Sequence, residues 1–573
     1  MTRKSKARYN LNRTYKVSQT VKALRRALAL GLATAVVAPA AQAGTCISVI
    51  NDVFCFGDFG DDTLDSWTSG ELAVYDTFDP ATVEMDGSIY TDNTEGMVVW
   101  NNNDLTFIND GFVIVNDSGA QYNSYNRVGV YAESFQGDVS FENTGVIAVV
   151  EDSGNWGSSF TVGARIEAAQ DITVTNSSFI ASDNDGGFSA GLQAVSYGGG
   201  SISITNSATG DIGAEANNFG NAVALGVYGG GGTITVSNAG DIGASAVDDY
   251  GSAFGVRTFN GNTTITASGT SEINVQGYDA FGISATVYGG QTVDISNAGL
   301  IETDAFDDAY GIRVSQSGYG NVSVTNSGTI DSYTANDWAA GISVYANTGD
   351  VTVTNSQYGT ILVDGGQDSA GISVRSDTGD VTVSNAGSIY STSSYAYGIY
   401  IYGADNNTIT VTNSGEINSD GGTNAVGIDI QGDGITVDVT NTGDIYANDG
   451  SRYNIGIRID ATNNGPTSYG SITVSNTGGR IEAGKYSGGS YGAAIGIETF
   501  ANGDITVTNS GSDALGYGSI VAVSDDSGRA TGISAYSENG NISISNTGGK
   551  YAGVVASSGF DVSPYGFAEA VAI

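Results

Sequence analysis

The chain has 573 residues, more than one ordinary compact core accommodates, with 84 Gly, 4 Pro, 2 Cys and no His. Charged residues make up only 14%, and 61 acidic residues outnumber 20 basic ones, for a formal net charge of -41. The lack of histidine excludes a Ser-His-Asp triad, a Cys-His pair and an ordinary zinc site. The acidic balance leaves no basic patch for nucleic acid, and we expect no cofactor.

Residues 1–43 are predicted to be a secretory signal peptide with an extended basic leader. The segment contains no acidic residue, and "RRALALGLATAVVAPAAQA" places two arginines before an apolar run that ends in small residues. Cleavage is expected between Ala43 and Gly44, so the mature chain is expected to be exported. A mitochondrial transit peptide is the alternative interpretation of this segment.

Two cysteines follow the predicted cleavage site. Cys46 and Cys55 lie in "CISVINDVFC" and are the only cysteines of the chain. In an exported protein this pattern predicts a local disulfide that closes a small hairpin. We interpret residues 44–95 as an N-terminal cap that contains this hairpin.

Residues 96–573 are a series of related units. Each unit contains an alternating segment that ends in Asn, as in "VTVTN" at 351–355, then a short segment such as "GTIDSY" at 328–333. A third segment follows the pattern small-x-Gly-apolar-x-apolar, as in "AAGISV" at 339–344. The repeated asparagines are Asn109, Asn143, Asn176, Asn206, Asn238, Asn297, Asn326, Asn355, Asn385, Asn413, Asn441, Asn476, Asn509 and Asn546. Between Asn238 and Asn297, Ser268 is expected at the Asn position.

The three segments of each unit are predicted to be strands. In "VTVTN" the valines point to one side and the threonines to the other, and in "GISV" Ile and Val share a side. The apolar surface of one unit is too small to offset the entropy of ordering it, whereas stacked units share a core and pair their backbones. The pattern therefore predicts an all-β, right-handed parallel β-helix with three-strand coils and about 15 rungs.

The repeated Asn is expected at a corner of every coil. Because an amide both donates and accepts hydrogen bonds, stacked copies are expected to form a ladder along the helix. The Gly that follows is expected to allow a turn with positive φ. Ligand contacts and glycan attachment are the alternative roles of these asparagines.

The outward residues suggest several weaker hypotheses. Acidic turns such as "DFGDD" and "DAFDD" are interpreted as a source of solubility or, alternatively, of loose cation binding, and no specific metal site is predicted. Arg257, Arg313 and Arg458 lie at outward positions of "GVRT", "GIRV" and "GIRI", where an anion-binding strip is one interpretation. The chain has 31 Tyr, which either stack on sugar rings or suit the surface of strands.

Taken together, the basic leader, the "CISVINDVFCFGD" opening and the "ITVTNSGxI…GI.V" coils resemble the passenger domains of bacterial type V autotransporters of the adhesin-like kind. The resemblance covers nearly the whole chain. It implies Sec export, passage through the outer membrane by a C-terminal β-barrel, and a role in adhesion. The implied partner is a surface ligand or glycan of a host or neighbouring cell, with self-association as an additional expectation. No amphipathic barrel strands follow the coils, so cap and barrel are expected beyond residue 573.

The sequence therefore predicts a non-enzymatic, adhesin-type binding scaffold at the cell surface or outside the cell. Membrane contact is expected only through the barrel, and no catalytic, cofactor-binding or metal-ligating residue is assigned. A secreted carbohydrate-active β-helix enzyme, a polysaccharide lyase or hydrolase, is the second hypothesis. An extracellular matrix or surface-layer protein without a barrel is the third.

Overall fold

The structure is a computed structural model, and every regular element among the residues that it describes is a β-strand. It describes residues 45–49, 52–56, 63–64, 67–68, 72–76, 81–85, 88–91, 95–117, 127–151, 160–217, 220–246, 250–404, 407–462, 470–484, 493–510, 520–524, 530–547 and 554–558. Within these residues no helix is long and apolar enough to cross a membrane. The chain divides into two compact units, unit 1 with Met1–Thr286 and Gly299–Ala305, and unit 2 with Val287–Ala298 and Phe306–Ile573.

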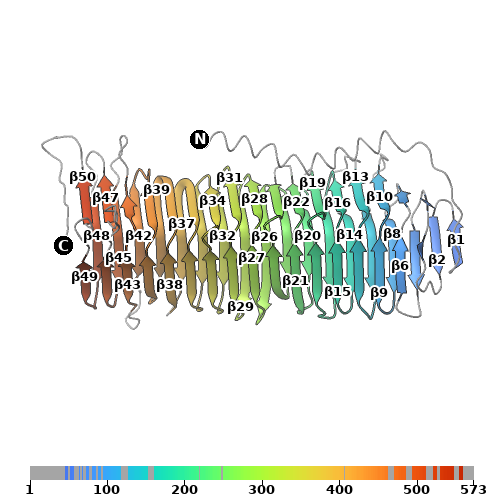
Figure 1. Cartoon of the computed structure of the whole chain (residues 1–573), viewed down its shortest axis with the longest axis horizontal. Coiled ribbons are helices and arrows are strands. Elements are labelled where there is room, and N and C mark those ends of the chain that lie inside the picture. The colour runs from blue at the N-terminus through green and yellow to red at the C-terminus, as the bar shows by residue number, and fades with distance from the viewer. Residues whose placement is uncertain are drawn as a thin grey trace. The chain divides into compact units, whose positions relative to one another are not determined.

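Both units are parallel β-helices, which confirms the predicted all-β, parallel β-helical class. Each strand pairs in parallel with the strand at the same place in the next coil, as β30 (Val322–Asn326) does with β33 (Val351–Asn355). Within each unit the strands of successive coils lie side by side (Figure 1). The number of rungs in the whole chain stays a prediction, because several coils include residues that the structure does not describe.

A coil contains up to three strands, which we name by their motifs. The asparagine strand ends at the repeated Asn position, the following strand comes directly after it, and the glycine strand contains the small-x-Gly-apolar pattern. In unit 2 two of the following strands run on without a break into their glycine strands, which gives the long strands β37 (Ser388–Gly403) and β39 (Glu416–Gly432).

Unit 1 contains strands of all three kinds. Its asparagine strands are β3 (Thr63–Leu64), β6 (Ala81–Met85), β9 (Leu105–Asn109), β12 (Val139–Asn143), β15 (Ile172–Asn176), β18 (Ile202–Asn206), β21 (Thr233–Asn238) and β24 (Asn262–Ala267). Its following strands are β4 (Trp67–Thr68), β7 (Ser88–Thr91), β10 (Phe112–Asp117), β13 (Val146–Glu151), β16 (Phe179–Asn184), β19 (Asp211–Ala216), β22 (Asp241–Ala246), β25 (Glu272–Gly277) and β28 (Leu300–Ala305). The strands in the position of the glycine strand are β2 (Asp52–Phe56), β5 (Leu72–Asp76), β8 (Glu95–Asn101), β11 (Arg127–Ser134), β14 (Phe160–Ala168), β17 (Phe188–Ser196), β20 (Ala222–Tyr228), β23 (Ser252–Phe259) and β26 (Asp279–Gly289), whose last three residues belong to unit 2.

Unit 2 repeats the same order. Its other asparagine strands are β27 (Val293–Asn297), β36 (Val381–Asn385), β38 (Thr408–Asn413), β40 (Thr436–Asn441), β43 (Ile472–Asn476), β46 (Ile505–Asn509) and β49 (Ile542–Asn546). Its separate following strands are β31 (Thr329–Thr334), β34 (Thr360–Asp364), β41 (Asp444–Asn448), β44 (Ile481–Ala483), β47 (Ile520–Ser524) and β50 (Val554–Ser558). Its separate glycine strands are β29 (Ala309–Gly318), β32 (Trp338–Ala346), β35 (Asp368–Ser376), β42 (Tyr453–Ala461), β45 (Ala493–Ala501) and β48 (Ala530–Ser537).

Alternation along the strands builds the core. In β33, Val351 and Val353 are buried while Thr352 is exposed. In β32, Ile342 and Val344 are at most 2% exposed and share the inner side, as the pattern predicts. Aliphatic side chains of neighbouring coils therefore stack on one another, and each coil is stabilised mainly by the next.

The repeated asparagines form a hydrogen-bonded ladder within each unit. Nδ2 of each Asn donates to Oδ1 of the Asn one coil further on, at 2.7–2.9 Å. In unit 1 the ladder runs through Asn109, Asn143, Asn176, Asn206 and Asn238. In unit 2 it runs through Asn297, Asn326, Asn355, Asn385, Asn413, Asn441, Asn476, Asn509 and Asn546. Many of these amides also donate to a nearby carbonyl, as Asn355 does to Gly359.

The two ends of the unit 1 ladder differ from the pattern. Met85 pairs with Asn109 and cannot donate to it, so the buried Oδ1 of Asn109 has no hydrogen bond among the described residues. At the other end, Asn238 pairs with Ala267, so the expectation that Ser268 takes the Asn place is wrong by one residue. The alternation in β24 buries Thr263, Ile265 and Ala267, which sets this register.

The glycines after the repeated Asn serve a purpose other than the expected one. A Cβ at Gly415 would lie 2.0 Å from the carbonyl oxygen of Gly387, and one at Gly443 would lie 2.0 Å from that of Gly415. None of these three has positive φ, whereas Gly478 does. The expectation of a positive φ at this position is therefore wrong for most coils, because close stacking of backbones excludes a side chain instead.

The "GD" that opens many asparagine strands is also explained by contacts between coils. A Cβ at Gly379 would lie 2.0 Å from the carbonyl oxygen of Gly349. The backbone N–H of Asp380 donates to Oδ1 of Asp350 at 3.1 Å, and Thr408 N–H donates to Oδ1 of Asp380 at 2.9 Å. Gly, Asp and Asn in "GDVTVTN" thus recur because each fits the same residue one coil away.

The segment 44–95 contains the expected hairpin. Strand β1 (Thr45–Val49) pairs with β2 in antiparallel fashion. Parallel pairing begins directly after it, because β2 pairs with β5 and β5 with β8. The parallel ladder of the β-helix therefore reaches back into this segment.

Candidate functional site

Of the residues predicted for signal cleavage and for the disulfide, the structure describes only the backbone of the two cysteines. Ala43 and Gly44 lie outside the described residues. Cys46 lies directly opposite Cys55 in the β1–β2 register. This register is compatible with a cross-strand disulfide, but the two side chains lie outside the described part of the chain, and the disulfide stays a prediction.

The repeated asparagines do not form a surface. From Asn109 to Asn509 each is at most 1% exposed, and its amide is engaged in the ladder. Buried amides are not accessible to a ligand or to a glycan-transferring enzyme. The repeated asparagines therefore stabilise the fold and do not bind a ligand or carry a glycan.

Each of the three outward arginines contacts residues of its own unit. Arg257 and Arg313 lie over aromatic rings of their own strands, with Cζ 4.7 and 5.0 Å from the ring centroids. Arg458 Nη1 lies 3.9 Å from Oδ2 of the buried Asp429. In unit 2, four glycine-strand positions separate Arg313 from Arg458. Arg313 and Arg458 therefore do not form a continuous anion-binding strip on unit 2.

A stack of aromatic and cationic side chains on the outer face of unit 2 is the candidate site. Tyr345 on β32, Arg375 on β35 and Tyr402 on β37 share one register position. Arg375 Cζ lies 5.6 Å from the centroid of the Tyr345 ring and 5.5 Å from that of Tyr402. The side chain of Arg375 is 60% exposed, so the stack presents a cation held between two rings to solvent.

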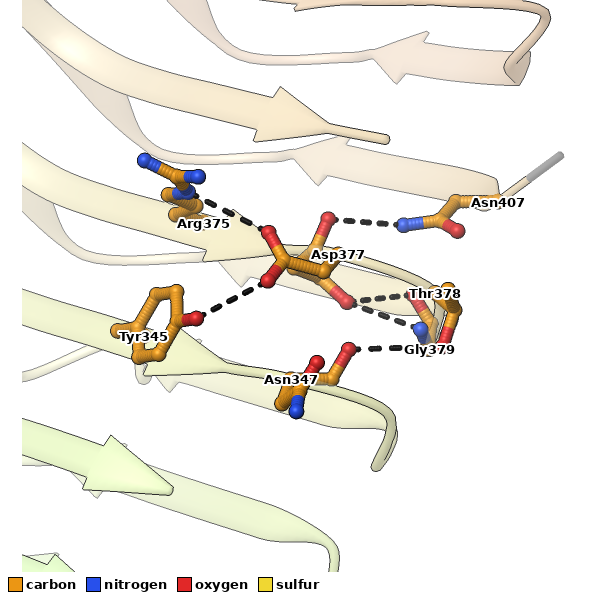
Figure 2. A network of polar contacts seen from close by, with 8 residues as sticks. Tyr345, Asn347, Arg375, Asp377, Thr378, Gly379 and Asn407 are labelled. Atoms are coloured by element: carbon orange, nitrogen blue, oxygen red, sulfur yellow. Dashed lines mark hydrogen bonds and ion pairs between the residues drawn. The ribbon is translucent and has the colours of Figure 1, made fainter. Parts of the chain in front are cut away.

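A carboxylate fixes two members of this stack. Tyr345 Oη donates to Oδ2 of Asp377 at 3.0 Å, and Arg375 Nε donates to Oδ1 at 3.4 Å (Figure 2). The hydrogen bond to Asp377, with a smaller contribution from burial, raises the pKa of Tyr345. Tyr345 therefore stays protonated and keeps its place as a donor at neutral pH.

The turn that carries this carboxylate is itself held by neighbouring coils. Asn407 Nδ2 donates to the carbonyl oxygen of Ser376 at 3.1 Å, and Thr378 N–H donates to that of Asn347 at 2.9 Å (Figure 2). Ser376 Oγ accepts from Gly379 N–H at 3.1 Å. The site is thus built on strands and on a turn held by hydrogen bonds to neighbouring coils, which fixes the geometry of the stack.

A second polar cluster lies on the glycine strands of unit 1. Tyr131 Oη lies 2.6 Å from Oε2 of Glu133 and 2.8 Å from Oε2 of Glu167, and Arg165 Nε donates to Oε1 of Glu167 at 2.6 Å. Burial raises the pKa of Glu133. Glu167 is 2% exposed, so most of this cluster serves to lock neighbouring strands.

The described residues contain no group of three or more Cys, Asp or Glu side chains arranged to hold a metal ion. Loose cation binding by the acidic turns stays a prediction. Comparison of the chain with family models, with curated proteins and with solved structures finds no match.

The sequence contains a signal for the stack. Tyr345, Arg375 and Tyr402 each lie four residues after the glycine of a Gly-Ile-x-apolar motif, at Gly341, Gly371 and Gly398. An equal offset from an aligned motif places residues in one row of a β-helix. The carboxylate of Asp377 gives no such signal, because its role depends on the path of the turn.

Proposed function

We propose that the chain is an exported, passenger-like β-helix that acts as a binding scaffold at the cell surface or outside the cell. The observation that supports this most directly is the braced stack of Tyr345, Arg375 and Tyr402. Half-buried rings and an exposed guanidinium group, held rigidly on strands, bind polar partners at a low cost in conformational entropy. The basic leader and the resemblance to autotransporter passengers support export and an adhesin-like role.

Three measurements on cells that produce the chain test this proposal. Mass spectrometry is expected to find an N-terminus at Gly44, and external protease is expected to degrade the chain on intact cells or in the medium. Cells with the chain are expected to attach to other cells or to immobilised glycans more than cells without it. A chain that stays inside the cell with residues 1–43 attached would contradict the proposal.

A carbohydrate-active enzyme is a second candidate, supported by Glu133 and Glu167. The two carboxyl groups lie within hydrogen-bond distance of one hydroxyl, and the raised pKa of Glu133 is a property of general acids. Release of reducing or unsaturated ends from polysaccharides, abolished in Glu133→Gln, would favour this candidate. If Glu133→Gln releases as many sugar ends as the unchanged chain, Glu133 is not the general acid of that activity.

A further inference from the structure

The outer face next to the stack combines small side chains with large ones. At the register position of Arg313, the next two strands carry Ser343 and Ser373, and the strand after them carries Tyr400. Two adjacent coils with serine span roughly 10 Å at a strand spacing of about 4.8 Å. This pair of serines, which we call the serine step, places two small side chains between the longer side chains of Arg313 and Tyr400.

The stack borders the serine step. Tyr345 and Arg375 lie two residues further along the same strands as Ser343 and Ser373, and side chains two residues apart on a strand point to the same face. Arg375 uses Nε for Asp377. Its Nη1 and Nη2 groups lie on an exposed side chain and match the geometry of a carboxylate.

Charge limits the ligands that this surface can take. The chain as a whole is strongly acidic, with 61 acidic and 20 basic residues, and repels a polyanion at long range. A ligand with a single carboxylate experiences little of this repulsion and gains a direct contact with Arg375. Serine hydroxyls donate and accept hydrogen bonds, and a Tyr ring packs against the C–H face of a sugar.

We propose that the serine step and Arg375 form a subsite for a saccharide that carries one carboxylate. The sugar ring packs over Ser343 and Ser373 against Tyr400, and its carboxylate accepts hydrogen bonds from Nη1 and Nη2 of Arg375. The proposal rests on the proposed binding function and names the class of partner.

Titration calorimetry with the full chain tests the subsite, with 3′-sialyllactose as the acidic probe and lactose as the neutral one. Sialyllactose is expected to bind at least about 10-fold more tightly than lactose, and Arg375→Gln is expected to remove that difference. Ser373→Tyr is expected to block both sugars, because the ring fills the step. Arg452→Gln is the matched control, since Arg452 is an exposed arginine over the Tyr453 ring at 5.1 Å outside the subsite.

The outcomes separate the subsite from the proposed function. Equal binding of the two sugars, no binding of either, or unchanged discrimination in Arg375→Gln with a wild-type circular dichroism spectrum each overturns the subsite. If the subsite is overturned but cells with the chain still attach to glycans or other cells, the proposed binding function stands without the subsite. If attachment is absent as well, the subsite and the proposed function are both wrong.

Discussion

Asn355 Nδ2 lies 2.8 Å from Oδ1 of Asn385, thirty residues further along the chain, and both side chains are fully buried. Asn326 donates to Oδ1 of Asn355 in the same way, at 2.9 Å. Each amide inside the ladder therefore satisfies two neighbours, and its removal leaves buried polar groups on both sides.

We expect Asn355→Ala to lower the free energy of unfolding by about 2–4 kcal/mol, because it leaves a donor and an acceptor unpaired in the core. Urea unfolding followed by circular dichroism measures the change. Asn546→Ala is the matched control, since Asn546 is exposed and water can replace its contacts. An equal loss of unfolding free energy in both variants would show that the buried hydrogen bonds between neighbouring asparagines do not stabilise the fold.

Gly341→Ala is expected to destabilise unit 2 by about 1–3 kcal/mol. The added Cβ would lie 2.2 Å from Cγ2 of Ile361 and 2.7 Å from the carbonyl oxygen of Gly371. Thermal unfolding measures the shift. Gly422→Ala is the control, because no atom lies closer than 3.7 Å to a Cβ there. Similar melting temperatures for the two variants would contradict close stacking of the glycine strands.

Asp429→Asn is expected to stabilise the protein at neutral pH. Burial raises the pKa of Asp429 from 3.8 to about 6, against the smaller opposing effects of Arg458 and Gln431. The folded state thus keeps a proton that the unfolded state loses, so the stability from this group is present below about pH 4 and is lost as pH rises through 6. At pH 8 the variant is expected to gain on the order of 2 kcal/mol, and at pH 4 almost nothing.

Urea unfolding at pH 4, 6 and 8 checks this pH dependence. Asp438→Asn serves as the control, because Asp438 is exposed on β40 of the same unit. A gain for Asp429→Asn that is the same at all three pH values would refute the titration of Asp429 as its cause.

Cys46 and Cys55 are expected to form a disulfide in the exported protein. Alkylation of the denatured chain is expected to label neither cysteine before reduction and both after it, as read by mass spectrometry. Cys46→Ser with Cys55→Ser is expected to lower the stability of the β1–β2 hairpin by about 2–3 kcal/mol, since the closed loop is short. Full labelling without reductant would rule out the bond.

The parallel β-helix could be predicted from the sequence because its information is local and repeated. Period-two alternation in "VTVTN" fixes which side chains enter the core, and the recurring Asn, at spacings of 28 to 37 residues, marks the register between coils. The predicted register was wrong by one residue at Ala267, where the coil lacks the Asn that marks the register in other coils. Without that Asn the sequence does not distinguish between two registers one residue apart. The prediction of positive φ at the glycines after Asn was wrong for a different reason. These glycines allow the backbones of two coils to approach closely, and that contact exists only when coils stack.

The sequence by itself determined the all-β class, the parallel coil and the ladder of repeated asparagines, because each follows from a pattern that recurs in every repeat. Only the tertiary structure decided which outward residues meet. The contact of Tyr345 with Asp377, and the place of Arg375 between two rings, depend on side chains about thirty residues apart and on the path of a turn. Contacts of this kind arise when coils stack, and no single repeat contains them.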